Sequence, residues 1–142
     1  MTTSLNSSVP ARDYASAQLV HYLRKAINVL TTPAATVVNI GTLPPGALVL
    51  AGLSGVFVTA DFTGTTNVVD IGYATDGVTS ADGDAYATDL TLALTTGGFV
   101  AIDEMAVATG RPRTLETKIT ATWAGTASTG AFEVIIAYVP NR

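Results

Sequence analysis

The sequence predicts one all-β domain, an antiparallel β-sandwich or jelly roll, preceded by an extended N-terminal arm. The 142-residue chain is 48% hydrophobic but only 13% charged, and it contains 13 glycines. Its many Thr, Val, Ile, Gly and Asp residues favour strands and tight turns, whereas amphipathic helices carry many Lys, Glu and Leu. After residue 36, short β-rich runs alternate with turn residues. The length suits a single domain, so we assign residues 1–17 to the arm and 18–142 to the sandwich.

The predicted arm is rich in Ser, Thr and Asn, contains Pro10 and has no sustained apolar period. A segment of this composition cannot bury enough apolar surface to fold alone, and gains order on a neighbouring surface. We therefore expect it to bind a protein partner through its polar, charged and larger apolar side chains. These candidate partner-binding residues are Thr2, Ser4, Leu5, Asn6, Val9, Arg12, Asp13 and Tyr14.

The segment 17–30 fits two kinds of element. Its leucines and isoleucine recur at helical spacing, while the stretch from residue 19 to 29 also alternates as a strand does. A lone helix in an all-β chain would need a sheet face to cover. We favour a strand and keep the helix as the alternative.

Later strands are predicted from runs rich in β-branched and aromatic residues. Pro44-Pro45-Gly46 between two of them fits a type II turn, and Gly97-Gly98 fits a two-residue hairpin. In the run 115–123, alternate residues are apolar, which describes a sheet with one dry side. The expected strands are Thr36–Ile40, Leu48–Phe62, Asn67–Tyr73, Asp89–Thr95, Phe99–Val107, Leu115–Trp123 and Phe132–Val139.

Charge and composition argue against several classes of function. The net charge of −4 and the pI near 4.6 provide no basic field for nucleic acid. The longest apolar stretch, 47–60, falls short of the roughly 20 residues of a membrane helix, so we expect neither nucleic acid nor membrane as partner. The chain has no cysteine and a single histidine, His21, which excludes thiolate catalysis and a multi-histidine metal centre. We expect no enzyme activity and no cofactor.

Weaker candidate sites have simpler structural interpretations. Gly52-Leu53-Ser54-Gly55-Val56 lacks the second glycine of a nucleophile elbow. The pair Asp103-Glu104 would point to opposite faces of a strand. The Gly110–Arg113 turn is expected to be a solvated loop. Tyrosines that could form a sugar-stacking platform are expected in core and rim packing instead; these are Tyr73, Tyr86 and Tyr138.

An acidic loop, 75–88, carries carboxylates that could offer oxygen ligands to Ca²⁺. Its Asp-Gly pairs are ordinary turn formers, and it contains no Glu. We expect no metal site, with weak Ca²⁺ binding as the alternative. The carboxylates concerned are Asp76, Asp82, Asp84 and the following Asp89.

Three stretches together resemble the capsid decoration (cement) proteins of tailed bacteriophages. They read YLRKAINV at 22–29, VVNIGTLPPGALVLAGLSGVFVTADFTGTTNVVDIGYATDG at 37–77, and TKITATWAGTASTGAFEVIIAYV at 117–139. The shared features are a G-x-L-P-x-G-A turn, an F-x-x-G-T-T turn, an I-G exit and a last strand ending in Y-V. No contact residue of the family can be carried over, because partner surfaces vary within it and the chain shows no fixed binding motif.

The resemblance implies a sandwich or jelly roll that binds the major capsid protein on the outer shell. It also implies a homo-oligomer, often a trimer, located on the virion surface and made in the bacterial cytoplasm. The residues favour the same structural, non-catalytic role, because a charge-poor β domain with a polar arm suits protein contacts. The alternatives are a carbohydrate- or receptor-binding module of a tail or fibre and, further behind, a hydrolase using His21.

Overall fold

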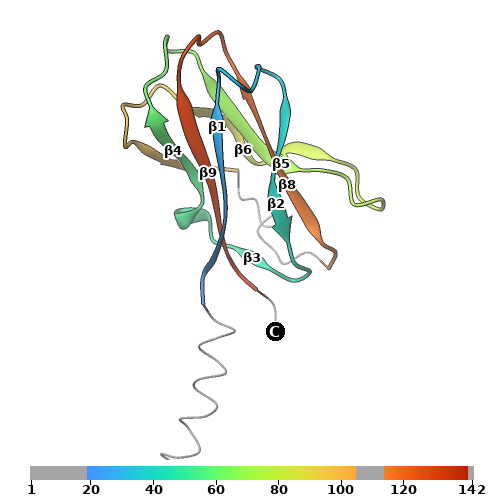
Figure 1. The fold of residues 1–142 in the computed structure, drawn as a ribbon. Helices are drawn as coiled ribbons and strands as arrows, with labels where there is room; N and C mark the ends of the chain where they lie inside the picture. The colour runs from blue at the N-terminus through green and yellow to red at the C-terminus, as the bar shows by residue number, and fades with distance from the viewer. Residues whose placement is uncertain (1–18, 105–113, 141–142) are drawn as a thin grey trace, which may run out of the picture.

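The computed structural model describes residues 19–104 and 114–140, and the predicted arm lies outside these ranges. They form two stacked antiparallel sheets, which confirms the predicted β-sandwich (Figure 1). The described residues contain no α-helix, only the single 3-10 turn η1. In chain order the elements are β1 (His21–Asn28), β2 (Val37–Leu43), β3 (Leu48–Val49), η1 (Ala51–Leu53), β4 (Gly55–Ala60), β5 (Val68–Tyr73), β6 (Asp82–Thr91), β7 (Phe99–Ala101), β8 (Thr117–Ala124) and β9 (Ala131–Val139).

Each sheet is built around one central strand from the C-terminal part of the chain. The β9 sheet has the order β1-β9-β4-β7, with the short β3 also pairing with β9. The β8 sheet has the order β2-β8-β5-β6. Most connections therefore cross from one sheet to the other, so the fold depends on long-range pairing. The jelly-roll variant of the sandwich stays a prediction, which this strand order supports.

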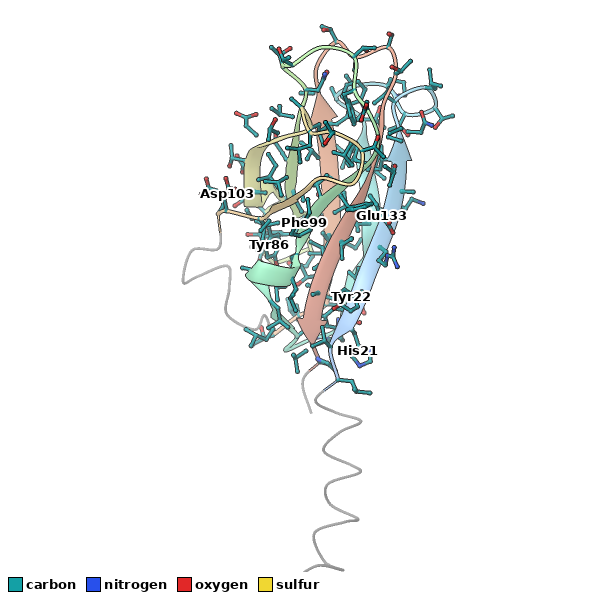
Figure 2. The ribbon with its side chains drawn as sticks, turned by 90° about the vertical axis from the view of Figure 1, so that its left-hand side faces the viewer. His21, Tyr22, Tyr86, Phe99, Asp103 and Glu133 are labelled. Carbon is teal, nitrogen blue, oxygen red and sulfur yellow. The ribbon has the colours of Figure 1, made fainter. Side chains whose placement is uncertain are left out.

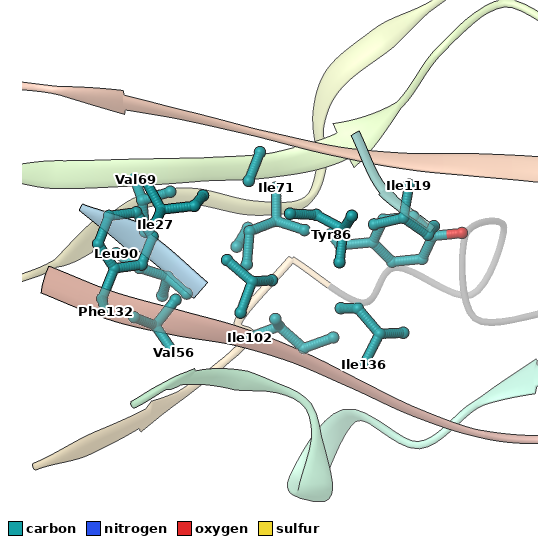
Figure 3. Packing of buried hydrophobic residues seen from close by; sticks show 14 of the residues in the cluster. Ile27, Val56, Val69, Ile71, Tyr86, Leu90, Ile102, Ile119, Phe132 and Ile136 are labelled. Atoms are coloured by element: carbon teal, nitrogen blue, oxygen red, sulfur yellow. The ribbon is translucent and has the colours of Figure 1, made fainter. Parts of the chain in front are cut away.

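The core fills the space between the sheets with alternate side chains from both (Figure 3). On β8 the predicted dry side is confirmed, since Thr117, Ile119, Ala121 and Trp123 are buried, although Leu115 lies before the strand and is exposed. Burial of each large apolar side chain contributes about 1.5 to 3 kcal/mol. The fully buried large side chains include Val56, Val69, Ile71, Tyr86, Leu92, Ile119, Phe132, Val134 and Ile136.

The ambiguous segment 17–30 contains strand β1, as favoured from its sequence. It pairs with β9 over its whole length, from His21 opposite Tyr138 to Asn28 opposite Ala131. Ile27 is buried in the core and Leu23 packs against it, so the two-residue alternation outweighs the helical spacing.

The prediction of one long strand over Leu48–Phe62 is wrong. The chain instead forms β3, η1 and β4, because the hydroxyl of the buried Ser54 bonds to backbone groups where the strand is interrupted. Its Oγ donates to the Leu50 carbonyl at 2.8 Å and accepts from the Ala137 amide at 2.9 Å. Gly55 follows at a close approach to β7, where a side chain would overlap the Val100 carbonyl oxygen.

Two more boundaries differ from those expected. The strand predicted at Asp89–Thr95 runs instead from Asp82 to Thr91, and the one predicted at Phe99–Val107 ends at Ala101. Gly97-Gly98 is not a hairpin, because β6 and β7 belong to different sheets. Gly97 does adopt a positive φ of 92°, but it lies in the connection that leads from β6 in one sheet to β7 in the other.

Buried polar groups tie the loops to the sheets. The Asn67 side chain, 1% exposed, donates to the Thr63 carbonyl at 3.0 Å and accepts from the Ala127 amide at 3.1 Å. It thereby joins the β4–β5 and β8–β9 connections. Trp123 Nε1 donates to the Thr32 carbonyl at 2.8 Å and so fixes the β1–β2 connection.

We predict that Asn67→Ala lowers the free energy of unfolding by about 1 to 3 kcal/mol, because it leaves buried backbone groups without partners. Urea unfolding followed by tryptophan fluorescence measures this effect. Asn39→Ala, at an exposed position of β2, is the control and should change stability by less than about 0.5 kcal/mol. Equal effects of the two variants would contradict the role assigned to Asn67.

Candidate interaction surface

The outer face of the β9 sheet carries exposed apolar side chains, among them Tyr22 and Phe99 (Figure 2). Tyr22 on β1 is 51% exposed, Phe99 on β7 is 45% exposed and Leu48 on β3 is 41% exposed. Between them lie half-buried apolar side chains of β4 and β9. We define the apolar outer face as Tyr22, Ala26, Leu48, Phe57, Phe99, Ala101, Ile135 and Val139.

The opposite surface of the sandwich has a different character. The outer side of the β8 sheet is covered mainly by hydroxyl, amide and charged side chains, with Val37 as an apolar exception at 65% exposure. Its exposed or half-buried polar residues include Asn39, Asp70, Thr88, Asp89, Thr91, Lys118 and Thr122. One side of this molecule therefore suits water and the other suits an apolar partner.

An ion pair lies within the apolar outer face. Arg24 Nε donates to Glu133 Oε1 at 2.7 Å and Arg24 Nη2 donates to Oε2 at 3.0 Å, a bidentate arrangement. The hydrogen bond to Glu133 and its charge raise the pKa of Arg24. The two charges cancel, so the face has no net charge, and an open hollow of about 250 Å³ beside the pair is lined by Tyr22, Arg24 and Ile135.

A second hollow, of about 260 Å³, lies between the β4–β5 and β6–β7 connections. Its carboxylate, Asp61, is already engaged, since Oδ1 accepts from the Thr96 amide at 2.6 Å and from Thr96 Oγ1 at 2.7 Å. These donors lower the pKa of Asp61. The carboxylate holds the β6–β7 connection in place. The hollow is lined by Asp61, Phe62, Gly64, Thr65, Ala93, Leu94 and Thr95.

The partner-binding candidates of the arm, from Thr2 to Tyr14, lie outside the described residues, as does the Gly110–Arg113 turn. His21 is exposed at the start of β1, where its ring centroid lies 5.6 Å from that of Tyr138. Ser54, considered as a nucleophile, is fully buried and bonded to backbone. Among the residues that the structure describes, the Ser54 hydroxyl bonds to the backbone of Leu50 and Ala137 and not to His21.

The other candidates have structural positions. Tyr73 and Tyr86 are buried, with ring centroids 6.2 Å apart in an edge-to-face arrangement, so core packing is confirmed for them. Asp76 caps its own loop by accepting from the amides of Val78 and Thr79. Within residues 19–104 and 114–140, no three His, Asp or Glu side chains gather as metal ligands would. No helix in the same ranges is long and apolar enough to span a membrane.

The acidic loop is shorter than expected, because Asp82 and Asp84 belong to strand β6. Side chains two residues apart on a strand share one face. Asp82 and Asp84 share a hydrogen bond there, which raises the pKa of Asp82.

Sequence reasoning missed the apolar outer face, although a signal for it exists in the last strand. The run Phe132–Val139 is apolar at almost every position, whereas a strand with one wet side alternates. A near-continuous apolar run indicates a strand covered on both sides. Applied to this run, that rule predicts an apolar partner for the outer side of β9.

Comparison with known proteins shows a shared fold. No protein-family model and no curated protein sequence matches the chain. A chain of the structure described as the capsid of Ralstonia phage GP4 is 20% identical, with a TM-score of 0.62 over 89% of this chain and 87% of that one. A chain of the cyanophage Pam1 capsid asymmetric unit is 18% identical, with a TM-score of 0.61 over 88% and 87%. A chain of the acid-stable capsid of Helicobacter pylori bacteriophage KHP30 is 14% identical, with a TM-score of 0.54 over 86% and 88%.

We predict opposite acid responses from two carboxylates. The folded-state pKa of Asp61 lies below its unfolded value of about 3.9, so its stabilising effect is complete above about pH 5 and is lost as the pH falls further. Asp61→Asn should therefore destabilise the protein at pH 7 and much less at pH 3. Urea unfolding at both pH values measures the difference.

Asp82 provides the control of opposite sign. Its raised pKa means that the folded protein binds this proton more tightly than the unfolded chain does, so Asp82→Asn should stabilise the protein at pH 7 relative to pH 3. The same sign of change for both variants would contradict the assignment.

Proposed function

We propose that this chain is a structural virion protein of a tailed bacteriophage, one that binds the outer capsid shell and stabilises it. Its partners are then the major capsid protein and further copies of itself, and its place is the virion surface. The observation that carries this proposal is the shared fold with chains of three phage capsid structures, which spans nearly nine tenths of this chain and of those.

The described residues support a role without catalysis. Both residues considered for catalysis have structural surroundings. The His21 ring lies beside that of Tyr138, and Ser54 is fully buried. What the domain does offer is an apolar surface without net charge on one side, a feature typical of proteins that bind other proteins.

We assign the shell contact in part to the N-terminal arm, residues 1–17. An arm ordered by its partner loses conformational entropy, which many extended contacts along its length must offset. Affinity then depends on the length of the arm more than on any single side chain. Arg12 and Asp13 are its only charges, and isolated exposed charges contribute little.

The alternative, a carbohydrate- or receptor-binding module of a tail or fibre, has less support from the residues. The three tyrosines considered for a sugar platform do not form one, since Tyr73 and Tyr86 are buried in the core. A trimer, as implied by the resemblance, remains part of the proposal.

The direct test is the amount of this protein in purified virions of the phage that encodes it. Quantitative mass spectrometry should find a copy number comparable to that of the major shell protein. A few copies per particle would point to the tail or fibre, and absence from the particle would overturn the proposal.

We predict that deletion of residues 1–16 weakens attachment to undecorated shells at least tenfold while the thermal unfolding temperature changes little, because the segment adds few core residues. Co-sedimentation with shells measures attachment, and circular dichroism measures unfolding. The Arg12→Ala and Asp13→Ala variants are the controls and should bind almost normally. Undiminished binding of the truncated chain would place the shell contact on the sandwich.

A further inference from the structure

We propose that the hollow beside Asp61 binds a single uncharged sugar residue. The hollow lies between the β4–β5 and β6–β7 connections and has a volume of about 260 Å³; we call it the Asp61 hollow. This inference goes beyond the proposed function, which assigns no small ligand to the chain. The site is also separate from the tyrosines considered above for a sugar platform.

The walls of the Asp61 hollow are held in place by the rest of the fold. Asp61 Oδ1 accepts from the amide and the hydroxyl of Thr96 at 2.6 and 2.7 Å, which joins the two connections. The β6–β7 connection is also tied to β4, because the Gly97 amide donates to the Val58 carbonyl at 2.8 Å. A ligand therefore meets walls that are already positioned, which lowers the entropic cost of binding.

Three polar groups of the hollow are open to a ligand. The second carboxylate oxygen of Asp61, Oδ2, accepts no hydrogen bond from a described residue, because both contacts of Thr96 go to Oδ1. Thr65 and Thr95 also line the hollow, and within residues 19–104 and 114–140 neither of their hydroxyls takes part in a hydrogen bond. The carboxylate only accepts, whereas each hydroxyl can both donate and accept. Sugar hydroxyls also do both, so they can satisfy all three groups.

Charge favours an uncharged sugar over ionic ligands. None of the described residues that line the hollow is basic, and the hydrogen bonds from Thr96 lower the pKa of Asp61, so it stays ionised. The whole chain carries −4, which repels phosphate, sulfate and carboxylate groups. A lysine or arginine side chain would pair with Asp61 but has only donors, so it could not accept from the threonine hydroxyls.

The apolar part of the hollow suits the carbon side of a sugar ring. It is formed by Phe62, Ala93 and Leu94. Phe62 is fixed in position, since its ring centroid lies 5.9 Å from that of Phe132 and a Cβ at Gly130 would lie only 2.6 Å from its Cγ. Small-molecule pockets measure about 300 to 1,000 Å³ and combine apolar walls with a few polar groups. A volume of about 260 Å³ falls just below that range, which suits one ring better than a longer saccharide.

The hollow opens at the end of the sandwich opposite to the start of β1 (Figure 1). Ala60, next to Asp61, and Asn28 both pair with Ala131, so the end of β4 is level with the end of β1. β1 has eight residues at about 3.3 Å each, so the hollow lies about 25 Å along the sheet from His21, which follows the arm. An arm that holds the shell leaves this end directed outwards. That direction rests on the proposed function, whereas sugar binding by the isolated chain does not.

Titration of the isotope-labelled full chain, followed by amide NMR spectra, tests the proposal. The probes are glucose, galactose, mannose and N-acetylglucosamine, each up to about 50 mM, because a ligand of so few atoms is expected to bind in the millimolar range. At least one probe should shift the amide signals of Gly64, Thr65 and Leu94 and reach saturation. The signals of Tyr22 and Val37, on the outer sides of the two sheets, should stay in place.

Two variants and one matched control assign the binding to the hollow. Thr65→Val removes one hydroxyl at nearly constant shape and should raise the dissociation constant at least fivefold. Ala93→Phe fills the hollow and should abolish saturation. Thr66→Val replaces the neighbouring threonine, which is equally exposed but does not line the hollow, and should leave the constant within twofold. All three positions are exposed, and circular dichroism verifies that the variants fold.

Each outcome supports or overturns the site. No shift with any of the four sugars, or equal effects of Thr65→Val and Thr66→Val, overturns the proposal. Shifts of the same amides by N-acetyl-lysine amide, without shifts by the sugars, would assign the hollow to a basic side chain instead. Copy number in virions is a separate measurement. A chain that binds sugar but is absent from virions keeps this site and loses the proposed function, and an abundant chain that binds no sugar loses only this inference.

Discussion

The packing of strand β9 is the constraint on which the rest of the structure depends. It forms hydrogen-bonded ladders with β1, β3 and β4, so it fixes the register of three strands from the N-terminal half of the chain. Its inward residues Phe132, Val134 and Ile136 are fully buried. Because successive side chains of a strand point to opposite faces, a shift of one residue would move all of them to the outside. The core thus determines which residues remain on the outer face.

That consequence links folding to function. With the inner positions filled, the outer positions of the β9 sheet still carry Tyr22, Ile135 and Phe99, while the β8 sheet presents threonine and charged groups to water. The two surfaces of one sandwich therefore differ in what they can bind. The Arg24–Glu133 pair on this surface leaves the apolar side without net charge, so the interactions of that side depend on shape and apolar contact more than on long-range attraction.

Polar groups inside the sandwich give the loops defined positions. Ser54, Asn67 and Trp123 each bond to backbone far away in sequence, which ties the connections at the ends of the sheets to the core. A rigid body of this kind can present a flat face to one partner and an extended segment to another. In the arrangement we propose, the arm contributes to the shell contact.

The sequence by itself determined the fold class, most strand positions and the dry side of β8, because two-residue alternation and the turn at Pro44-Pro45-Gly46 are local signals. It could not determine the break after Val49, since the Ser54 hydroxyl is engaged by an amide 83 residues away. Nor could it assign β6 and β7 to different sheets, because a glycine pair fits a hairpin as well as a crossing. The extent of the apolar outer face was also decided only by tertiary structure: the near-continuous apolar run of β9 signals a strand covered on both sides, but only the sheet order shows which other strands share its outer side.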